Sequence, residues 1–282
     1  MKALITGASS GIGRDMARYL ASKNIDLILV ARRKENLEKL ANELNVKVTI
    51  ISLDLSNEKN VYKLYDKCID ENIDILINNA GFGLFGDFID TDLDRELSMI
   101  DVNIKAPHIL TKLFLKDFIN KDFGYILNVC SVAGFMAGPK LNTYYATKNY
   151  LTKLTMAINE ELRQKNSKVV ISALCPGPTS TEFNKVANGK FGIKEITSEY
   201  VAKYGIDKMF KGKMIIFPTL LMKLGNFGLR FIPYRLQLII TYHIQFRKTK
   251  NDWENFNHFF LENTYYFPRF VNIYIFCCWC FW

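Results

Sequence analysis

The stretch Thr6-Gly7-Ala8-Ser9-Ser10-Gly11-Ile12-Gly13 decides the fold of this chain of 282 residues. It follows the apolar run Ala3-Leu4-Ile5 and opens a helical pattern, so it lies between a strand and a helix. Amides at a helix N-terminus are unpaired and bind phosphate. Gly7 permits a tight turn, and Gly11 and Gly13 allow close approach to a pyrophosphate. The stretch predicts a dinucleotide site, although taken alone it is also typical of a plain turn.

Short apolar runs alternate with helical patterns over the first two-thirds of the chain. The runs are rich in β-branched residues and apolar on both faces, which is typical of buried parallel strands. Helices are predicted near residues 12–22, 33–44, 57–71, 92–119 and 143–165. The alternation predicts an α/β fold of the Rossmann type, a doubly wound parallel sheet of seven strands at residues 3–5, 27–30, 48–51, 75–77, 125–129, 169–172 and 214–217.

The chain divides into three parts by composition. We expect a dinucleotide-binding catalytic domain over residues 1–217, with a substrate loop at about 178–212 that includes a helical piece near 198–210. Residues 218–248 form a basic, apolar C-terminal extension. Residues 249–282 hold 13 aromatics in 34 positions without a helical or strand period. We interpret them as a non-native or disordered tail, with an interfacial anchor or a partner-binding tail as alternatives.

The net charge of +9 comes from one region, because residues 185–250 hold 13 Lys and Arg against three Asp and Glu. Such a surface suits an anionic cofactor, anionic lipid or nucleic acid, and nucleic acid is least favoured because no binding motif accompanies it. Of the six cysteines, Cys68, Cys130 and Cys175 are widely separated, and only three histidines are present, which argues against a metal site. The first strand follows Met1 directly, so we expect a cytoplasmic protein, with peripheral membrane contact through 218–282 as an alternative.

Two arginines, Arg32 and Arg33, end the second predicted strand. NAD-specific sites place an acidic residue near this position to bind the ribose 2′-hydroxyl, and none is present here. A guanidinium offers a planar fork of donors that suits a 2′-phosphate. We therefore predict NADP(H) as the cofactor, with Arg32 on the phosphate and Arg33 or Lys34 as a second contact. A solvated helix start is the simpler alternative, but positive charge there opposes the helix dipole.

Two further strand ends carry polar or small residues. Asp54-Leu55 follows the third strand, where a carboxylate could accept the adenine amino group or could only cap a turn. Asn78-Asn79-Ala80-Gly81 follows the fourth strand, where small residues and amides suit a crowded place beside a cofactor or an ordinary turn.

The predicted catalytic set is Ser131, Tyr144 and Lys148. Tyr144 and Lys148 lie at i and i+4 of one helix, so both side chains leave the same face. A phenol has a reference pKa of about 10, and we expect the nearby ammonium to lower the pKa of Tyr144 and make it a usable general acid or base. Ser131 follows the fifth strand and could hold the substrate oxygen near the phenol. Tyr-xxx-Lys alone is common on ordinary helix faces, and Tyr145 lies on the adjoining face.

Taken together, these motifs resemble the short-chain dehydrogenase/reductase family over roughly residues 2–217. The elements occur in family order, and Ser131 stands 13 residues before Tyr144. They are the glycine turn at 6–13, Asp54, Asn78-Asn79-Ala80-Gly81, Asn103, Ser131, Tyr144-xxx-Lys148 and Pro176-Gly177. The ending Ala31-Arg32-Arg33 looks like the NADP-preferring members. A looser likeness points to the branch of steroid and long-chain acyl reductases.

The resemblance implies a role for each matched residue. Tyr144 would donate or accept the proton, Lys148 would bind the nicotinamide ribose, and Ser131 would orient the substrate. Asn103 would hold a water in a proton relay to Lys148. The segment that would seat the nicotinamide is the one that holds Pro176, Gly177, Thr179 and Thr181, where Thr179 replaces the more usual Val or Ile.

The sequence thus predicts an oxidoreductase that interconverts a carbonyl and a secondary alcohol of a small molecule. Apolar residues between 183 and 233 favour an apolar substrate. Homo-oligomers are common in the family, and the sequence leaves open whether this chain forms one. The alternatives are an NADP-binding sensor or scaffold without turnover, and a peripheral membrane protein.

Overall fold

The carboxyl edge of one parallel sheet positions the functional residues of this chain. The computed structural model describes residues 1–183 and 195–246. Seven parallel strands pair in the order β3-β2-β1-β4-β5-β6-β9. The predicted seven-stranded sheet is confirmed, with strands β1 (Lys2–Thr6), β2 (Asp26–Ala31), β3 (Val48–Ser52), β4 (Ile75–Asn78), β5 (Tyr125–Val129), β6 (Val170–Leu174) and β9 (Ile215–Ile216). The order reverses between β1 and β4, the place where ligands bind in such sheets.

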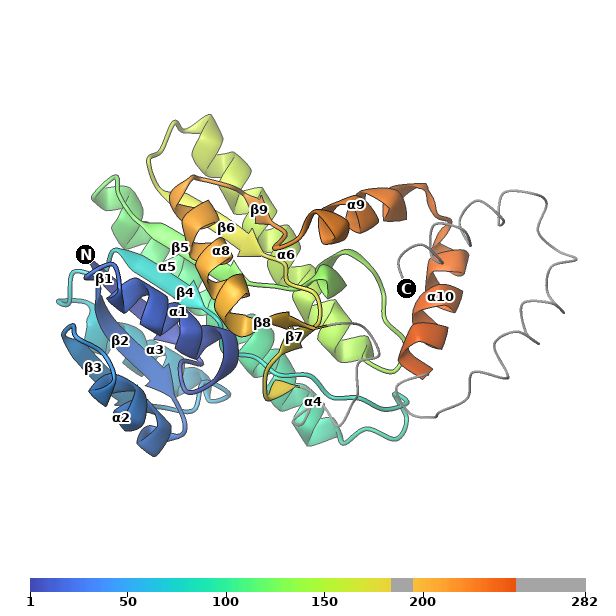
Figure 1. The fold of residues 1–282 in the computed structure, drawn as a ribbon, viewed down its shortest axis with the longest axis horizontal. Coiled ribbons are helices and arrows are strands. Elements are labelled where there is room, and N and C mark those ends of the chain that lie inside the picture. The colour runs from blue at the N-terminus through green and yellow to red at the C-terminus, as the bar shows by residue number, and fades with distance from the viewer. Residues whose placement is uncertain (184–194, 247–282) are drawn as a thin grey trace, which may run out of the picture.

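Helices cover both faces of the sheet (Figure 1). Successive residues of a strand point to opposite faces, so Leu27 and Leu29 enter one core while Ile28 and Val30 enter the other. The first core packs against α1 (Gly11–Ala21), α2 (Lys34–Asn42) and α8 (Ser198–Phe210). The second core packs against α3 (Glu58–Cys68), α5 (Ala106–Asn120) and α6 (Asn142–Gln164).

The prediction of one helix over residues 92–119 is wrong in one respect, because a π-helical turn interrupts it. The segment consists of α4 (Leu93–Ile100), the π turn at Asp101–Lys105, and α5. Pro107 has no backbone N–H and so cannot continue the α-helical hydrogen bonds across this turn. The amide of Ala106 instead reaches back five residues to the Asp101 carbonyl. The π turn places Asn103 in a buried position.

A second, two-stranded sheet lies within the predicted substrate loop. Thr179–Ser180 (β7) pairs in parallel with Ile196–Thr197 (β8), and α8 follows immediately. These strands are too short for a periodic pattern to predict them, whereas the helix predicted over 198–210 is confirmed. Residues 184–194 of the loop lie outside the described residues.

The predicted extension contains two helices, α9 (Leu220–Gly228) and α10 (Tyr234–Phe246), joined through a 3-10 turn at Leu229–Phe231. They lie at the opposite end of the molecule from β3 (Figure 1). Within the described ranges, none of the helices has the length and apolar character needed to cross a bilayer. The aromatic tail at 249–282 lies outside the described residues.

Candidate active site

A cavity of about 620 Å³ lies along the carboxyl edge of the sheet. Its wall is formed by the segments that follow β1 to β6, by α6, and by Thr241 of α10. The predicted site residues in this wall are Gly7, Ser9, Ser10, Gly11, Ile12, Arg32, Arg33, Asp54, Leu55, Asn79, Ala80, Gly81, Ser131, Tyr144, Lys148, Pro176, Gly177, Thr179 and Thr181. The predicted residues that are not in this wall are Gly13, Lys34, Asn78 and Asn103.

The glycine turn is shaped by contacts that exclude larger side chains. Gly7 has a φ of 66°, and a Cβ there would lie 2.8 Å from Ala80 Cα. A Cβ on Gly13 would overlap the Asn79 side chain. Ser10, at the N-cap of α1, makes no side-chain hydrogen bond to the first helical turn. The turn therefore leaves the first amides of α1 at the cavity, where they suit a phosphate.

The Asn79 amide fastens the end of β4 to this turn. Its Nδ2 donates to the carbonyls of Thr6 (3.0 Å) and Gly7 (3.1 Å). In return, the Thr6 hydroxyl accepts from the backbone amides of Asn79 (3.0 Å) and Ala80 (3.1 Å). Two neighbouring strand ends are held as one unit, so Asn79 supports the shape of the predicted phosphate site.

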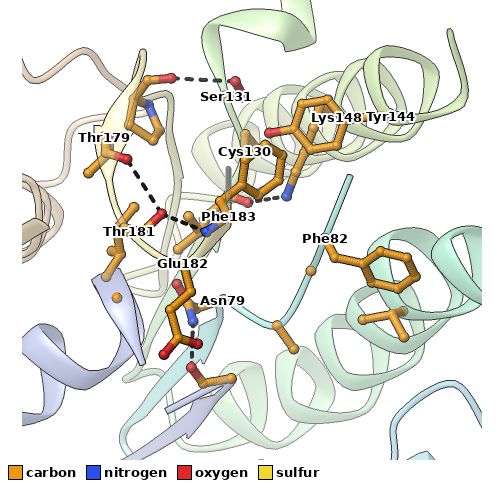
Figure 2. A pocket seen from close by; sticks show the side chains of 18 of the residues that line it. Asn79, Phe82, Cys130, Ser131, Tyr144, Lys148, Thr179, Thr181, Glu182 and Phe183 are labelled. Carbon is orange, nitrogen blue, oxygen red and sulfur yellow. Dashed lines mark hydrogen bonds between the residues drawn. The ribbon is translucent and has the colours of Figure 1, made fainter. Parts of the chain in front are cut away.

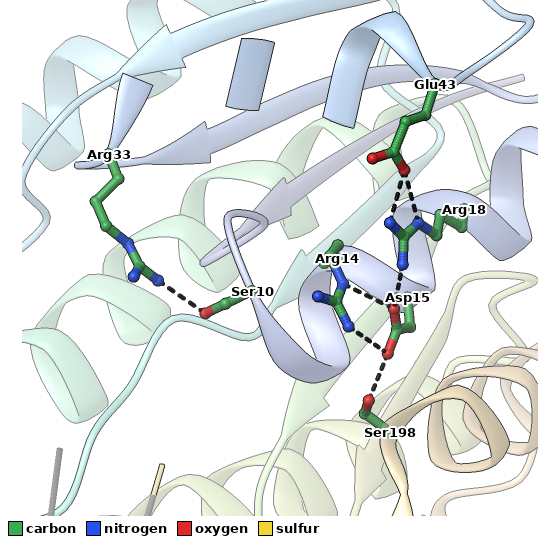
Figure 3. A network of polar contacts seen from close by, with 7 residues as sticks. All are labelled: Ser10, Arg14, Asp15, Arg18, Arg33, Glu43 and Ser198. Atoms are coloured by element: carbon green, nitrogen blue, oxygen red, sulfur yellow. Dashed lines mark hydrogen bonds and ion pairs between the residues drawn. The ribbon is translucent and has the colours of Figure 1, made fainter. Parts of the chain in front are cut away.

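The two arginines that follow β2 reach the cavity in different ways. Arg33 Nη2 donates to the hydroxyls of Ser10 (3.0 Å) and Ser9 (3.4 Å) and pairs with Glu182 at 2.8 Å. Arg32 lines the cavity and is exposed. Arg33 thus carries a cation to the glycine turn, as Figure 3 shows for its bond to Ser10.

Asp54 lies in the cavity wall and also stabilises a turn. Its Oδ1 accepts from the Ser56 amide (3.0 Å) and the Ser56 hydroxyl (2.9 Å). Both interpretations of Asp54 are thus compatible with its position, and its contact with adenine stays a prediction.

The phenol of Tyr144, the hydroxyl of Ser131 and the ammonium of Lys148 gather on one side of the cavity (Figure 2). Lys148 is buried, and its Nζ donates to the Val129 carbonyl at 2.9 Å. Ser131 Oγ accepts from the Ala133 amide at 3.1 Å and donates to the Pro176 carbonyl at 3.4 Å. The ends of β5 and β6 therefore orient the serine and the lysine beside the first turn of α6.

The predicted effect of Lys148 on Tyr144 is wrong for the structure as described. Burial raises the pKa of Tyr144 well above its ordinary range, and the hydrogen bond with Ser131 opposes that rise only in part. Burial also lowers the pKa of Lys148. The apolar surroundings disfavour both charged forms, so the phenol is held protonated.

Asn103 lies behind the cavity wall and anchors the loop after β4. Its Nδ2 donates to the Phe82 carbonyl (2.9 Å) and to the Thr147 hydroxyl (3.1 Å), and its Oδ1 accepts from the Phe82 amide (3.1 Å). A Cβ on Gly81 would lie 2.9 Å from this oxygen and 3.4 Å from Lys148 Nζ. Asn103 and Lys148 thus both approach Gly81, while the role of Asn103 in a water relay stays a prediction.

The segment after β6 is held by its own threonines. Thr179 Oγ1 donates to the Gly177 carbonyl at 2.9 Å, and Thr181 Oγ1 accepts from the Phe183 amide at 3.2 Å. Thr181 also closes over the glycine turn, since a Cβ on Gly11 would lie 3.0 Å from its Cγ2. Thr179 and Thr181, the two predicted nicotinamide contacts, thus belong to one ordered segment of the cavity wall.

Several cavity residues were not predicted from the sequence. Phe183 packs on Tyr144 with ring centroids 5.1 Å apart, and Tyr145, on the adjoining helix face, also lines the wall. Thr241 reaches the cavity from α10, far along the chain. The missed apolar residues beyond the phenol include Phe82, Met136 and Leu141. No local signal marks them, because only the tertiary fold brings them together.

A polar network joins α1, which carries the glycine turn, to α8 (Figure 3). The buried Asp15 accepts from Arg14 Nε at 2.9 Å, from Arg18 Nη1 at 3.2 Å and from the Ser198 hydroxyl. Arg18 extends the network to Glu43 at 2.6 Å. The network fixes the start of α8 against the helix of the predicted phosphate site.

Replacing Asp15 with Ala is expected to lower the free energy of unfolding by about 1–3 kcal/mol, because the buried Ser198 hydroxyl and two guanidiniums lose their acceptor. Urea unfolding measures this. Glu43→Ala is the matched control, since its ion pair is half-exposed and worth at most about 1 kcal/mol. Equal losses of unfolding free energy in the two variants would contradict the role of Asp15 in fixing α8 against α1.

In the described part of the chain, no group of three or more His, Cys, Asp or Glu side chains is arranged to hold a metal ion. Cys68, Cys130 and Cys175 are buried free thiols, as expected for small core residues.

Comparison with known proteins places this geometry in a family. Residues 1–190 match the model of the short chain dehydrogenases. An uncharacterized oxidoreductase of Staphylococcus epidermidis is 32% identical over 185 residues, which cover 65% of this chain and 80% of that protein. An NADP-dependent 3-hydroxy acid dehydrogenase of Schizosaccharomyces pombe is 37% identical over 191 residues, covering 65% and 73% respectively.

Solved structures share the fold. A short-chain dehydrogenase from Sphingobium yanoikuyae in complex with NADPH superposes with a TM-score of 0.73 at 27% identity, covering 82% of this chain and 96% of that one. A bulky-bulky ketone specific alcohol dehydrogenase from Comamonas testosteroni gives 0.69 at 27% identity, with 82% and 94% covered. Because the family model matches about two-thirds of the 282 residues, this chain belongs to the short-chain dehydrogenase family.

Proposed function

We propose that this protein is an NADP(H)-dependent oxidoreductase that interconverts a bulky, uncharged carbonyl compound and its secondary alcohol. The observation that carries the proposal is that Ser131, Tyr144 and Lys148 line the same cavity as the glycine turn. A proton-handling set and a phosphate-binding turn at one sheet edge are the parts that hydride transfer needs.

The residues present fit a nicotinamide dinucleotide phosphate. The uncapped first turn of α1 suits the pyrophosphate, and the Arg33 guanidinium at Ser9 and Ser10 supplies positive charge for a 2′-phosphate next to Arg32. The NADPH complex of the Sphingobium enzyme and the NADP-dependent yeast relative support this choice. When bound, the nicotinamide donates or accepts the hydride at the substrate carbon.

Tyr144 transfers the proton of the substrate oxygen in this proposal. Burial keeps the phenol protonated, which is the form that carbonyl reduction needs, but the raised pKa also makes its proton harder to transfer. Ser131 positions the oxygen beside the phenol, and its hydrogen bond favours the phenolate. Lys148 binds the cofactor ribose, and Asn103 acts as a positioning residue through Thr147 and the loop at Phe82.

The shape and charge of the cavity favour an apolar substrate. Beyond the phenol, the wall is formed by Phe82, Met136, Leu141, Tyr145 and Phe183. Within the described wall, the charged side chains are those of Arg32, Arg33, Asp54, Lys148 and Glu182. All but Lys148 belong to the adenosine end, so the described residues at the reacting end offer no second cation for a carboxylate. The ketone-specific Comamonas relative supports a bulky neutral ketone.

Alcohol oxidation by Ser131→Ala is expected to require higher pH than oxidation by the wild type. Oxidation needs the phenolate, and loss of the Ser131 hydrogen bond raises the pKa of Tyr144 further. The rising limb of the kcat/KM profile should therefore move to higher pH, while the maximum rate also falls. Ser56→Ala, at a hydroxyl bonded to Asp54, is the control and should leave the limb in place. If the rising part of the kcat/KM profile of Ser131→Ala stays at the wild-type pH, Ser131 does not assist the proton transfer.

A screen of ketones and secondary alcohols with NADPH, NADH, NADP⁺ and NAD⁺ tests the function directly. We expect NADPH oxidation that is fastest with bulky neutral ketones and slow with charged keto acids. Tight NADPH binding without turnover of any carbonyl would instead favour a cofactor-binding sensor or scaffold.

A further inference from the structure

The helices α9 and α10 turn an apolar stripe outward. Within each helix its residues recur every three or four positions and so share one face of that helix, and they are between 39% and 85% exposed. We name this the extension stripe, formed by Leu220, Leu224, Phe227, Phe231, Tyr234, Leu238 and Tyr242. Water-facing helix surfaces are normally polar, and exposed apolar patches of this kind mark interaction sites.

The other sides of the same helices are used inside the molecule. Met222 of α9 covers Gly177 closely enough that a Cβ there would overlap its Cε, and Thr241 of α10 enters the cavity wall. Gln237 Nε2 donates to the carbonyls of Leu229 (2.8 Å) and Ile232 (2.7 Å), which fixes the turn between the helices. The stripe is therefore a defined surface held against the active site.

The charges around the stripe have one sign. Lys223, Arg230 and Arg235 are exposed, and Arg230 lies over the Phe227 ring at 6.0 Å. The sequence contains no Asp or Glu between Asp207 and Asp252. A second copy docked stripe to stripe would bring these cations together without a compensating carboxylate, which opposes self-association.

We propose that the extension stripe docks on the surface of an anionic lipid bilayer. Aromatic and aliphatic side chains would enter the acyl boundary while the flanking cations meet anionic headgroups. Residues 249–282, beyond α10, hold 13 aromatics in 34 positions, three of them Trp, and such aromatics are enriched at membrane interfaces. If the proposed function holds, α10 places the apolar end of the cavity next to the lipid, where bulky neutral ketones dissolve.

Vesicle flotation of the full-length protein tests the docking surface without turnover. The probes are vesicles of phosphatidylcholine, with and without phosphatidylglycerol. We expect binding to the anionic vesicles and little to the neutral ones. The double variant Leu224→Glu/Phe227→Glu should lower the bound fraction by about tenfold or more, because two apolar side chains that would enter the acyl boundary become charged. Lys223→Glu/Arg230→Glu should lower it as well.

The matched control is Tyr62→Glu/Ile69→Glu, which adds the same charge at exposed apolar positions of α3 and its C-cap. It should bind vesicles as the wild type does. Absence of wild-type binding, or equal binding by both the stripe variants and the control, would overturn the proposal. Concentration-dependent dimers that the stripe variants abolish, without vesicle binding, would identify a second copy as the occupant instead. Reduction of a water-soluble ketone, measured in the same samples, tests the proposed function separately.

Discussion

Replacing Tyr144 with Phe is expected to lower kcat for carbonyl reduction by about 10²–10⁴-fold, the contribution usual for a positioned general acid. The substitution removes only the phenolic oxygen. The ring keeps its contact with Phe183, at 5.1 Å between centroids, so the cavity wall should keep its shape. NADPH affinity, measured by fluorescence titration, should change little because the arginines and the glycine turn are untouched.

Tyr145→Phe is the matched control for this variant. Tyr145 lines the same cavity, its ring lies 6.2 Å from that of Tyr144, and the same atom is removed. It should leave kcat near the wild-type value. Full activity in Tyr144→Phe, or equal losses in both variants, would exclude Tyr144 as the proton donor. A loss of NADPH binding in Tyr144→Phe would instead indicate a structural role.

Replacing Arg32 with Asp is expected to weaken NADPH binding by about 100-fold and NADH binding far less. The variant removes a charge-assisted contact worth about 1.5–3 kcal/mol and adds repulsion toward a 2′-phosphate. Arg33→Asp should act in the same direction, because its guanidinium already lies at Ser9 and Ser10. Dissociation constants for both cofactors give the ratio that decides the matter.

Lys34→Asp makes the same change of charge at the next position and serves as the control. Lys34 lies at the start of α2, is exposed, pairs with Glu38 at 3.3 Å and is not among the residues of the cavity wall. Its variant should leave the NADPH to NADH ratio unchanged. A similar change of the NADPH to NADH affinity ratio in all three variants would show a general effect of charge. An unchanged ratio in the two arginine variants would show that the 2′-phosphate does not bind at this end of β2.

The parts of the fold that were predictable are those with a local signature. Buried parallel strands are continuous apolar runs, so all seven strands could be located, with ends displaced by one or two residues, as in β6 at Val170–Leu174. The glycine turn was predictable because adjacent residues carry its signal: an apolar run, then three glycines, then a helical pattern. That Tyr144 and Lys148 share one helix face was predictable from their i, i+4 spacing, whereas their selection as a catalytic pair rested on the family resemblance.

The remaining features depend on contacts between distant parts of the chain. The approach of Thr241 to the cavity and the cover of Met222 over Gly177 follow from how α9 and α10 pack. The pKa of Tyr144 could not be judged from the adjacent lysine, because the burial that raises it is a property of the whole cavity. The π turn depends on Pro107 together with the side-chain bonds of Asn103.

The π turn at Asp101–Lys105 interrupts a regular helix at a place where the active site depends on the interruption. A chain one residue shorter between Asp101 and Lys105 could form an unbroken α-helix, but each residue of an α-helix advances by about 100°. The amide at 103 would then swing away from the Phe82 backbone and from Thr147, which it now joins. A regular helix here would thus lose the anchor of the active-site floor, so function and local helix stability make opposite demands on this segment.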